Sequence, residues 1–429
     1  MTMLLQNSLP HFDVIICGAG PSGLALSCYL ARSGYSVAVL EQAVFPRHQI
    51  GESLLPFSNQ IFEEIGFKKI LDQSFFVHKY AACFHSENTK TEKVFKFSNS
   101  LNPLYNSIYH VPRDKFDLLF INYAKELGVK VFQPYKFESL EKFSDKVIIN
   151  KELSANLFVR ANGIVNSILN PENYVENLPD DNKTAIYSYF KYDLDSHLDR
   201  QYSYDKYSKN DILINLFYED NNLCWSWAIP ISENIISVGF VMPSYIYAKF
   251  NSKNLTKMEI GKYLLQKNAR LLELLSDSQP LENYRIKFNF QRVSKNIVFD
   301  RELNIGDAAG FIDPVFSSGI HLGLNSSKLA FNMIKNLGKN TNYSYSEMES
   351  YQIDYQNLFW IYYKFVKTFY QKNIVEKFFL NISPELVDNE IARSFTSILS
   401  GDVITSNKIV NSLDPRRLNI NPRVSSIFL

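Results

Sequence analysis

An α/β fold is predicted by three features of this 429-residue chain. Near the N-terminus, two apolar runs flank a glycine-rich turn and a helical stretch, which is the order of a βαβ unit. A mostly antiparallel sheet layer is expected at about residues 181–284, and a helical region beyond about residue 340. Hydrophobic residues make up 46% of the chain, enough for a sizeable core, and the 21% of charged residues excludes a disordered chain.

Charge and cysteine content exclude several classes of protein. The 45 basic and 44 acidic residues give a net charge of +1, so no electrostatic argument favours a nucleic-acid partner. The four cysteines lie far apart without metal or disulfide spacing, which favours a reducing, cytoplasmic location and no bound metal. The N-terminus lacks the pattern of a secretory signal, and apolar runs end well before the ~20 residues of a membrane span.

The clearest local pattern is "FDVIICGAGPSGLALSCYLARSGYSVAVLEQ", where a strand, a Gly-x-Gly-x-x-Gly turn, a helix and a second strand follow in order. Such glycines let the backbone turn tightly and approach a pyrophosphate, while the helix N-terminus supplies N–H donors. Glu41 ends the second strand, where an acid can accept from a ribose hydroxyl. The alternative is a tight turn without a nucleotide, but the complete order favours a Rossmann-like dinucleotide site.

A second segment, "LNIGDAAGFIDPVFSSGIHLGLNSSKLA" (303–330), bears on the identity of the dinucleotide. It predicts a strand, then Gly306-Asp307, a loop and a long helix from about Gly319. With the N-terminal fingerprint it resembles the FAD-dependent flavoproteins typified by p-hydroxybenzoate hydroxylase and the geranylgeranyl reductases. The resemblance implies an FAD-binding domain of that type, with FAD held by Gly18, Gly20, Gly23, Glu41, Gly306 and Asp307, and with Arg47 and Arg113 near the flavin. For each arginine the alternative is a surface side chain that pairs with a carboxylate.

The chain departs from that group at one place. The family carries Asp-Ala-Ser/Thr-Gly at the end of its third strand, whereas this chain has Arg160-Ala161-Asn162-Gly163. A role for an acid at this position is therefore not expected.

Three stretches narrow the resemblance to the FAD-dependent halogenases that act on phenols and pyrroles. They are "FPRHQIGESLLP" (45–56), "WSWAIP" (225–230) and "DPVFSSGIHLGL" (313–324), and together the matches span most of residues 12–330. The resemblance implies an enzyme that uses FADH2, O2 and chloride or bromide to form hypohalous acid, which then halogenates an electron-rich ring. Because the chain has no second nucleotide fingerprint, we expect a separate NAD(P)H-dependent flavin reductase to deliver FADH2.

The halide requires hydrogen-bond donors, and "FSSGIHLGL" offers them. The backbone N–H groups of Ser318 and Gly319 at a helix N-terminus form a candidate halide site. The alternative is that Ser317 or Ser318 simply caps the helix, which is common.

The candidate catalytic residue is Lys79, within "FFVHKYAACFHS" (75–86). This stretch predicts one strand with Lys79, Ala81 and Cys83 on a single face, so that an ammonium points into a cavity. From the pattern alone a solvated lysine is the more common alternative. The resemblance favours the cavity, because halogenases place their catalytic lysine on this strand, where it binds hypohalous acid or forms a chloramine. Desolvation would lower its pKa and favour the neutral amine.

The substrate class is inferred from an absence. Tryptophan halogenases carry a glutamate where this chain has Phe316, and a ring attacked without that carboxylate must itself be activated. We therefore expect a phenolic or pyrrolic substrate, either free or tethered to a carrier protein, rather than tryptophan.

Trp225 and Trp227 alternate with Ser226 on a predicted strand, so their indoles point to the same side. This geometry suits core packing equally well. Beside the predicted FAD, halide and lysine sites, we expect the two indoles, with Phe316, to separate flavin from substrate, so that the ring is halogenated and not hydroxylated.

Two alternative functions remain at this point, an FAD-dependent monooxygenase and a geranylgeranyl-reductase-like oxidoreductase. The first is disfavoured by WSWAIP and the second leaves Lys79 and the two tryptophans unexplained.

The predicted organisation has an FAD-binding domain of residues 1–180 and 285–340 (with substrate-side strands at about 75–100), a sheet layer at 181–284 and a helical region at 341–429. The aromatic segment 358–370 is expected to pack as a helix into the body; a lid, a docking face or a membrane-surface face are the alternatives.

Overall fold

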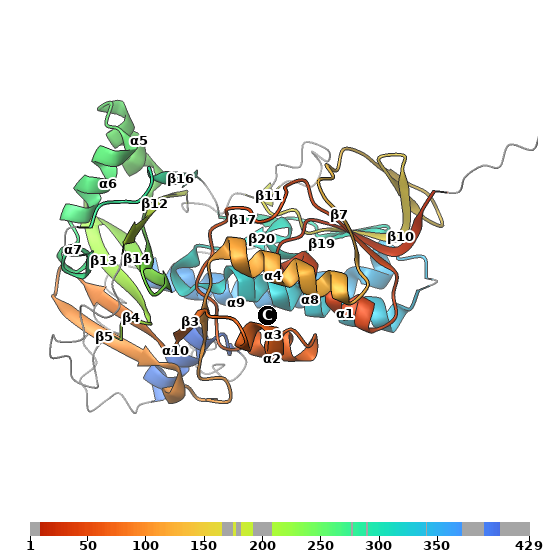
Figure 1. Cartoon of the computed structure of the whole chain (residues 1–429), viewed down its shortest axis with the longest axis horizontal. Coiled ribbons are helices and arrows are strands. Elements are labelled where there is room, and N and C mark those ends of the chain that lie inside the picture. The colour runs from red at the N-terminus through yellow and green to blue at the C-terminus, as the bar shows by residue number, and fades with distance from the viewer. Residues whose placement is uncertain are drawn as a thin grey trace, which may run out of the picture.

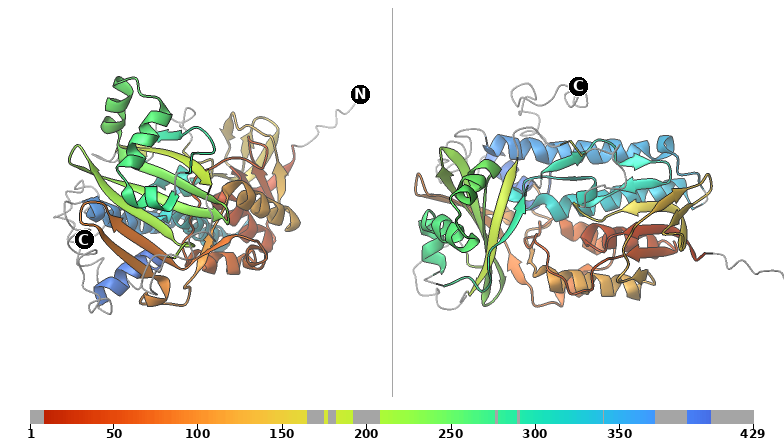
Figure 2. Two further views of the ribbon diagram at one scale, coloured as in Figure 1. Left: turned by 60° about the vertical axis from the view of Figure 1, so that its left-hand side comes forward. Right: turned by 90° about the horizontal axis from the view of Figure 1, so that it is seen from above.

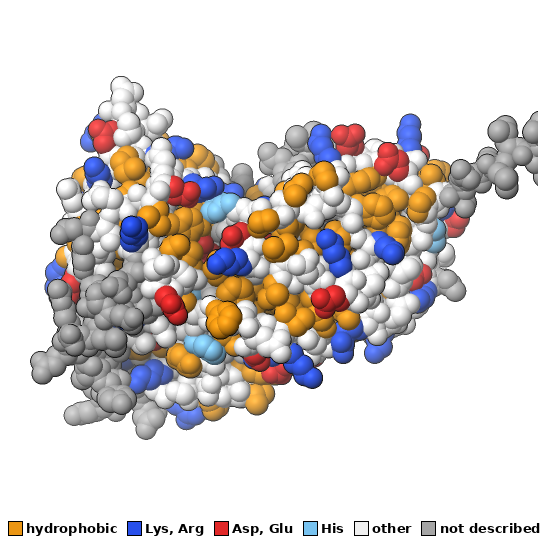
Figure 3. All heavy atoms as spheres, viewed as in Figure 1, with side chains coloured by type: hydrophobic (Ala, Val, Ile, Leu, Met, Phe, Trp, Pro, Cys, Tyr) orange, Lys and Arg blue, Asp and Glu red, His pale blue; other side chains and the backbone are white. Residues whose placement is uncertain are grey.

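The computed structural model describes residues 9–164, 175–176, 182–191, 208–275, 278–288, 291–339, 341–370 and 390–403. Two large sheets lie at opposite ends of an elongated molecule, with helices packed along and between them (Figure 1). The predicted α/β class is confirmed. On the face shown in Figure 3, charged side chains of both signs are interspersed with hydrophobic ones, and the surface is hollowed between the two ends.

The first sheet is built on parallel strands. Its order is β18 (Val298–Phe299), β19 (Glu302–Asn304), β10 (Leu153–Arg160), β1 (His11–Cys17), β2 (Val37–Leu40) and β7 (Lys130–Phe132), and the hairpin β8 (Leu140–Lys142) and β9 (Val147–Ile149) joins at β10. Strands β7, β2, β1, β10 and β19 are parallel, and Cys17 pairs with Leu40 on one side and with Arg160 on the other. Their carboxyl ends therefore meet at one edge, where ligands of open α/β sheets bind.

The second sheet is mostly antiparallel. Its order is β16 (Arg285–Phe288), β12 (Lys183–Lys191), β15 (Ile235–Pro243), β14 (Asn222–Ser232), β13 (Ile212–Glu219), β4 (Ala81–Ser86) and β5 (Thr91–Lys96). Only the β13–β4 pair is parallel among its described pairings. Alternation along β14 places Cys224 and Ala228 in one apolar core and Trp225 and Trp227 in another. The face of β14 that carries Trp225 and Trp227 is directed toward the first sheet.

Two small sheets complete the strands. One contains β11 (Val175–Glu176), β17 (Arg292–Ser294) and β20 (Gly310–Phe311), and the other pairs β3 (Val77–Lys79) with β6 (Ile108–His110). The prediction of one strand over residues 75–86 is therefore wrong. The chain turns at Tyr80, because the Asp211 carboxylate accepts from the backbone N–H groups of both Tyr80 and Ala81 at 2.8 Å. Residues 77–79 and 81–86 consequently belong to different sheets.

Helices cover both sheets. They are α1 (Pro21–Arg32), α2 (Ser58–Glu64), α3 (Lys68–Asp72), α4 (Arg113–Glu126), α5 (Ser244–Ser252), α6 (Lys257–Gln266), α7 (Ala269–Leu275), α8 (Ser318–Leu337), α9 (Tyr345–Tyr370) and α10 (Glu390–Ser400), with single 3₁₀ turns at 97–99, 306–308 and 314–316. Helices α5 to α7 pack on the outer face of the second sheet. Helices α8 and α9 lie alongside each other, as the right-hand view of Figure 2 shows, and α8 also packs on α1.

The segment 358–370 is helical as predicted, at the end of α9. Most of its aromatic side chains, including Phe359, Tyr362 and Phe369, are buried in the main core, so it packs into the body of the protein. Within the predicted helical region 341–429, residues 371–389 and 404–429 lie outside the described part of the chain. The predicted domain boundaries stay a prediction.

Candidate active site

A cavity of about 900 Å³ lies between the two sheets. Its wall is formed by the glycine-rich turn after β1, the segment 47–53, the ends of β2 and β10, the β14 tryptophans and the turn before α8. The residues predicted to bind the cofactor converge on this cavity although they come from distant parts of the chain. Those on its wall are Gly18, Gly20, Glu41, Arg47, Arg113 and Asp307.

The glycine-rich turn is a cradle that larger residues would fill. Gly18 has φ of +111°, and a Cβ there would lie 2.3 Å from the Ala161 carbonyl oxygen. A Cβ on Gly23 would lie 2.1 Å from the Gly18 carbonyl oxygen, so α1 could not pack so closely on β1. Gly20 is the N-cap of α1, whose first turn faces the cavity and offers N–H donors to an anion. This arrangement fits the pyrophosphate of a dinucleotide.

Glu41 sits at the end of β2 and is held by the backbone. Its Oε2 accepts from the Ala19 N–H at 3.0 Å, and its Oε1 accepts from the Ala43 N–H at 2.8 Å. These two bonds fix the carboxylate at the cavity wall, where each oxygen retains a lone pair for a ribose hydroxyl.

The two predicted arginines share one carboxylate. Arg113 donates to both oxygens of Asp117 at 2.9 and 3.0 Å and to the Ile50 carbonyl at 2.7 Å, while Arg47 lies 3.6 Å from Asp117. Both arginines therefore pair with an acid, as the alternative proposed, yet both also line the cavity and Arg113 is buried. Sequence reasoning missed Asp117, although its i, i+4 spacing from Arg113 in "RDKFD" is the signal for such a pair.

Asp307 reaches the cavity from the turn that follows β19. Gly306 adopts φ of +59°, and a Cβ there would lie 2.4 Å from Ser22 Oγ, so this turn packs directly against α1. Burial raises the pKa of Asp307 to about 6, and the nearby guanidinium groups of Arg113 and Arg292 oppose that rise. Arg292, on the short strand β17, also lines the cavity and was not predicted.

The candidate halide site is the N-terminus of α8, which begins at Ser318. Its N-cap, Ser317, is in the left-handed region with φ of 55° and makes no side-chain capping bond, and the Ser318 hydroxyl has no partner among the described residues. The alternative of simple side-chain capping is therefore wrong. Ser317 and Gly319 line the cavity, so the first N–H groups of the helix lie at its wall.

Trp225 and Trp227 form the wall of the same cavity on the side of the second sheet. Their ring centroids are 5.9 Å apart, Trp225 Nε1 donates to the Tyr370 hydroxyl at 2.7 Å, and Trp227 Nε1 donates to Ser237 Oγ at 3.2 Å. A Cβ on Gly239 would lie 2.3 Å from the Trp227 ring, so this glycine makes room for the indole. The two indoles are thus locked in place.

Phe316, which we predicted beside the tryptophans, is not among the residues that line the cavity. Its ring packs edge-on against Phe369 and Phe395, with centroids 5.6 and 5.9 Å away. The nearby Asp313 is also fully buried and accepts from the Tyr370 hydroxyl and the Val315 N–H, so its carboxylate is turned to internal partners.

Lys79 lies outside the cavity wall, at the end of β3. Its side chain is 1% exposed, and its Nζ donates to the Leu54 carbonyl at 3.0 Å and lies 5.4 Å from the centroid of Phe97. Burial lowers the pKa of Lys79 to about 7, against a smaller opposing effect of Asp211. Strands β3 and β6 contact β14, which carries the tryptophans.

Two neighbours of Lys79 were not predicted, Asp211 and His110. Asp211 holds the turn that ends β3, as described above. His110 on β6 is fully buried, and burial together with the charge of Lys79 lowers its pKa well below the usual value. Neither residue has a signal in the sequence. The pairing of β3 with β6 brings His110 near Lys79, and Asp211 comes from a part of the chain far from β3.

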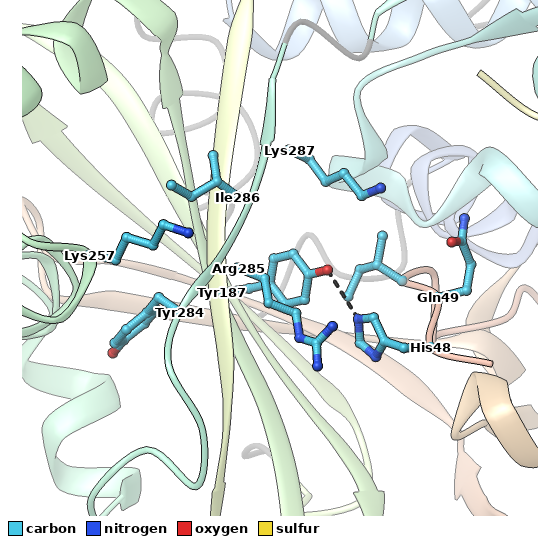
Figure 4. Close-up of a pocket in the computed structure, with 9 residues that line it drawn as sticks. His48, Gln49, Tyr187, Lys257, Tyr284, Arg285, Ile286 and Lys287 are labelled. Atoms are coloured by element: carbon cyan, nitrogen blue, oxygen red, sulfur yellow. Dashed lines mark hydrogen bonds between the residues drawn. The ribbon is translucent and has the colours of Figure 1, made fainter. Parts of the chain in front are cut away.

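A smaller pocket of about 310 Å³ adjoins the cavity and shares His48, Gln49, Ile50, Tyr187 and Lys287 with it. The His48 ring is hydrogen-bonded to the Tyr187 hydroxyl at 3.2 Å, and Lys257, Arg285 and Lys287 also line this pocket, with Lys257 at the end away from His48 (Figure 4). In the described part of the chain, no cluster of His, Cys, Asp or Glu is arranged to hold a metal ion. Of the helices described, none is long and apolar enough to cross a membrane.

Comparison with known proteins agrees with this geometry. The FAD binding domain family matches residues 11–161, and the tryptophan halogenase family matches residues 219–395. The chain is 30% identical to the 1H-pyrrole-2-carbonyl-[peptidyl-carrier protein] chlorinase of Pseudomonas fluorescens, over 95% of this chain and 92% of that one. It is 24% identical to the tryptophan 2-halogenase of Chondromyces crocatus, over 88% and 71% of the two chains.

Solved structures share the fold. A flavoprotein/dehydrogenase from Cytophaga hutchinsonii superposes with a TM-score of 0.80 at 23% identity, covering 97% of this chain and 98% of that one. The myxobacterial chondrochloren halogenase, an FAD-dependent enzyme, superposes with a TM-score of 0.75 at 22% identity, covering 97% and 96%.

Proposed function

Since the chain belongs to the flavin-dependent halogenases, enzymes that use FAD and a halide, we propose that it halogenates an activated phenolic or pyrrolic ring through Lys79. The observation that carries this proposal is the placement of Lys79. A lysine that is 1% exposed and bonded to the Leu54 carbonyl is a costly feature for stability alone. Its lowered pKa provides the neutral amine that can accept electrophilic halogen.

The cavity residues hold the cofactor. The glycine cradle and the first turn of α1 would bind the pyrophosphate, Glu41 the ribose and Asp307 a hydroxyl of the ribityl chain. Bound reduced FAD would supply, with O2, the oxidising power that converts a halide into hypohalous acid. The N–H groups at the start of α8 would hold the halide at the same cavity.

The two indoles would separate the oxidising cavity from the ring that is halogenated. Their Nε1 groups are anchored to Tyr370 and Ser237, so the wall that they form is rigid. A small neutral acid can pass such a wall, whereas an aromatic ring cannot approach the flavin through it. Lys79, which lies outside the cavity wall on a strand that contacts β14, would bind the acid and present the halogen.

The substrate is most simply a pyrrole or phenol tethered to a carrier protein. The relative with 30% identity acts on a pyrrole-2-carbonyl group carried by a peptidyl carrier protein. Phe316 stands where tryptophan halogenases have a glutamate, and the Phe316 side chain points into an aromatic cluster. Because no carboxylate assists at this position, the aromatic ring of the substrate must itself be activated. A free phenol is the second candidate on the same argument.

A separate NAD(P)H-dependent reductase would supply the reduced flavin. The glycine-rich turn after β1 is the single nucleotide fingerprint in the sequence, and the cavity that it faces is the one assigned to FAD. A reductase partner removes the need for a second nucleotide site in this chain.

The test is to supply reduced FAD, O2 and bromide with three substrates: a free phenol, a free pyrrole and a pyrrolyl carrier-protein thioester. The parent should brominate at least one ring, as judged by mass spectrometry, and the Lys79→Ala variant should form trappable hypobromous acid but no brominated ring. The half-buried Lys68, which pairs with Asp72 on α3, provides the matched control Lys68→Ala, expected to retain full activity. Hydroxylated products, or a Lys79→Ala variant as active as the parent, would rule the proposal out.

A further inference from the structure

Glu52 is a buried acid on the wall of the large cavity that the proposed function leaves unused. Its side chain is 3% exposed and comes from "GESLLP", between the flavin cavity and the second sheet. Oε1 accepts from the Tyr189 hydroxyl at 2.8 Å, and the Ser237 hydroxyl lies close enough to stabilise the carboxylate, but Oε2 has no hydrogen bond of ordinary geometry among the described residues. A buried carboxylate oxygen without a partner is costly, whereas a protonated oxygen can donate to whatever occupies the cavity.

The proposed function, on which this inference rests, requires such a donor. Oxidation of a halide follows FADH2 + O2 + X⁻ + H⁺ → FAD + HOX + H2O, in which the O–O bond breaks and an O–X bond forms. The halide and the reduced flavin each give two electrons to O2. The proton on the left must come from outside the flavin, and a group on the cavity wall must deliver it.

The other acids at the wall of the cavity are already engaged. Glu41 accepts a backbone N–H on each oxygen, and Asp307 faces the cations Arg113 and Arg292. Glu138 is exposed, on a surface loop. Among the described residues, Glu52 is the cavity acid that combines burial with a free oxygen.

We propose that protonated Glu52 supplies, from Oε2, the proton that halide oxidation consumes in the cavity. Two hydroxyl groups beside the Glu52 carboxylate connect it to the rest of the site. Ser237 also accepts from the Trp227 indole, and the ring of Tyr189 lies 6.0 Å from the His48 ring, centroid to centroid. His48 is exposed at the smaller pocket and lines both pockets, so solvent can return the proton to Glu52 from that side.

The groups that face Glu52 set the pH range over which it is protonated. They are Tyr187 and Tyr189 from β12, Ser237 from β15, and Arg113 and Asp114 from α4. Burial raises the pKa of Glu52 to about 7, Asp114 adds to that rise, and the hydroxyls of Ser237 and Tyr189 and the charge of Arg113 oppose it. The acid form is therefore present at neutral pH and is lost above it.

The first test measures hypohalous acid directly, with a chemical trap and no ring substrate, across about pH 5–9. The Glu52→Gln variant keeps an acceptor for Tyr189 but cannot ionise. It should form hypohalous acid at least about 100-fold more slowly than the parent. Reduced flavin and O2 should still be consumed, with release of H2O2. Glu63→Gln, on the exposed face of α2, is the control and should match the parent. A Glu52→Gln variant with the parent's rate and pH profile would overturn the proposal.

A second variant remains informative even if Glu52→Gln folds poorly. Tyr189→Phe removes a donor that lowers the pKa of Glu52, so the alkaline limb of the rate should move to higher pH with little loss at low pH. A loss of rate at every pH without that displacement would mean that Glu52 and Tyr189 are merely structural.

A third readout needs no turnover. Infrared difference spectra of the flavin-free protein should contain a protonated-carboxyl band that titrates with a midpoint near about pH 7 and is missing in Glu52→Gln, whereas the bands of Asp307 and Asp211, whose pKa values burial raises to about 6, should remain in that variant. Persistence of the band in that variant would refute the assignment. The Lys79→Ala variant separates this proposal from the proposed function: if it loses hypohalous acid formation while Glu52→Gln keeps it, the proton comes from Lys79 instead.

Discussion

At the scale of single residues, the burial of Lys79 makes the stability of the folded protein depend on pH. Its pKa is about 7 in the folded protein because of burial, against 10.5 as the ordinary value. Between these two values the unfolded chain binds a proton that the folded chain does not, so this residue makes stability rise with pH across that window. Below it, the buried charge destabilises the fold in full.

A Lys79→Met variant should therefore unfold at higher urea concentration than the parent at neutral pH, by a few kcal/mol in the free energy of unfolding. The difference should shrink as the pH rises toward 10.5. Urea titrations of both proteins at a series of pH values measure it, and a difference that does not change with pH would contradict the burial of a neutral amine.

Residues differ in how far the sequence predicts them. The glycines and Glu41 follow from local order along one βαβ unit, where neighbours in sequence are neighbours in space. Asp211, Arg292 and Ser237 carry no such signal, because only the pairing of distant strands brings them to the site. Glu52 lies within a recognised motif, but nothing in the motif indicates that one of its oxygens is left without a partner.

At the scale of elements, β14 and β15 fix the tryptophan wall. Trp227 faces Gly239 across the pair, and its ring occupies the space that a Cβ there would need. The strand and its two-residue alternation were predictable from "WSWAIP", but the neighbouring glycine on β15 was not, because register between strands is a tertiary property.

Gly239→Ala should displace the Trp227 indole and destabilise the fold by about 1–3 kcal/mol. Tryptophan fluorescence of the folded protein should change, and FAD affinity should fall because the indole lines the cavity. Val238→Ala is the matched control, since Val238 faces the opposite core and its truncation should lower stability without moving the indole. Equal fluorescence changes in both variants would mean that Gly239 has no special part in seating Trp227.

The split of residues 75–86 into β3 and β4 is the clearest failure at this scale. Apolar and small residues favoured one strand, yet every residue of β4 is buried on both faces and β3 belongs to another sheet. Asp211, far along the chain, turns the backbone between them. The turn places Lys79 on β3, which pairs with β6 and contacts β14, and not on β4 of the second sheet.

At the scale of the whole molecule, the fold class, the FAD cofactor and the halogenase family are confirmed. The cavity between the two sheets was not predictable in shape, because its wall combines many separate segments of the chain. The proposed function requires that the two indoles separate this cavity from the ring that is halogenated.

The most direct test of that wall is the product ratio of a Trp225→Ala, Trp227→Ala double variant loaded with FAD. With isotopically heavy O2, bromide and an accepted arene, mass spectrometry should find hydroxylated ring bearing the heavy oxygen beside the brominated ring. The parent, and a double variant with phenylalanine at both positions, should give brominated ring alone. If the alanine variant binds FAD as the parent does and still yields brominated ring alone at the parent's rate, the two indoles do not separate flavin from substrate.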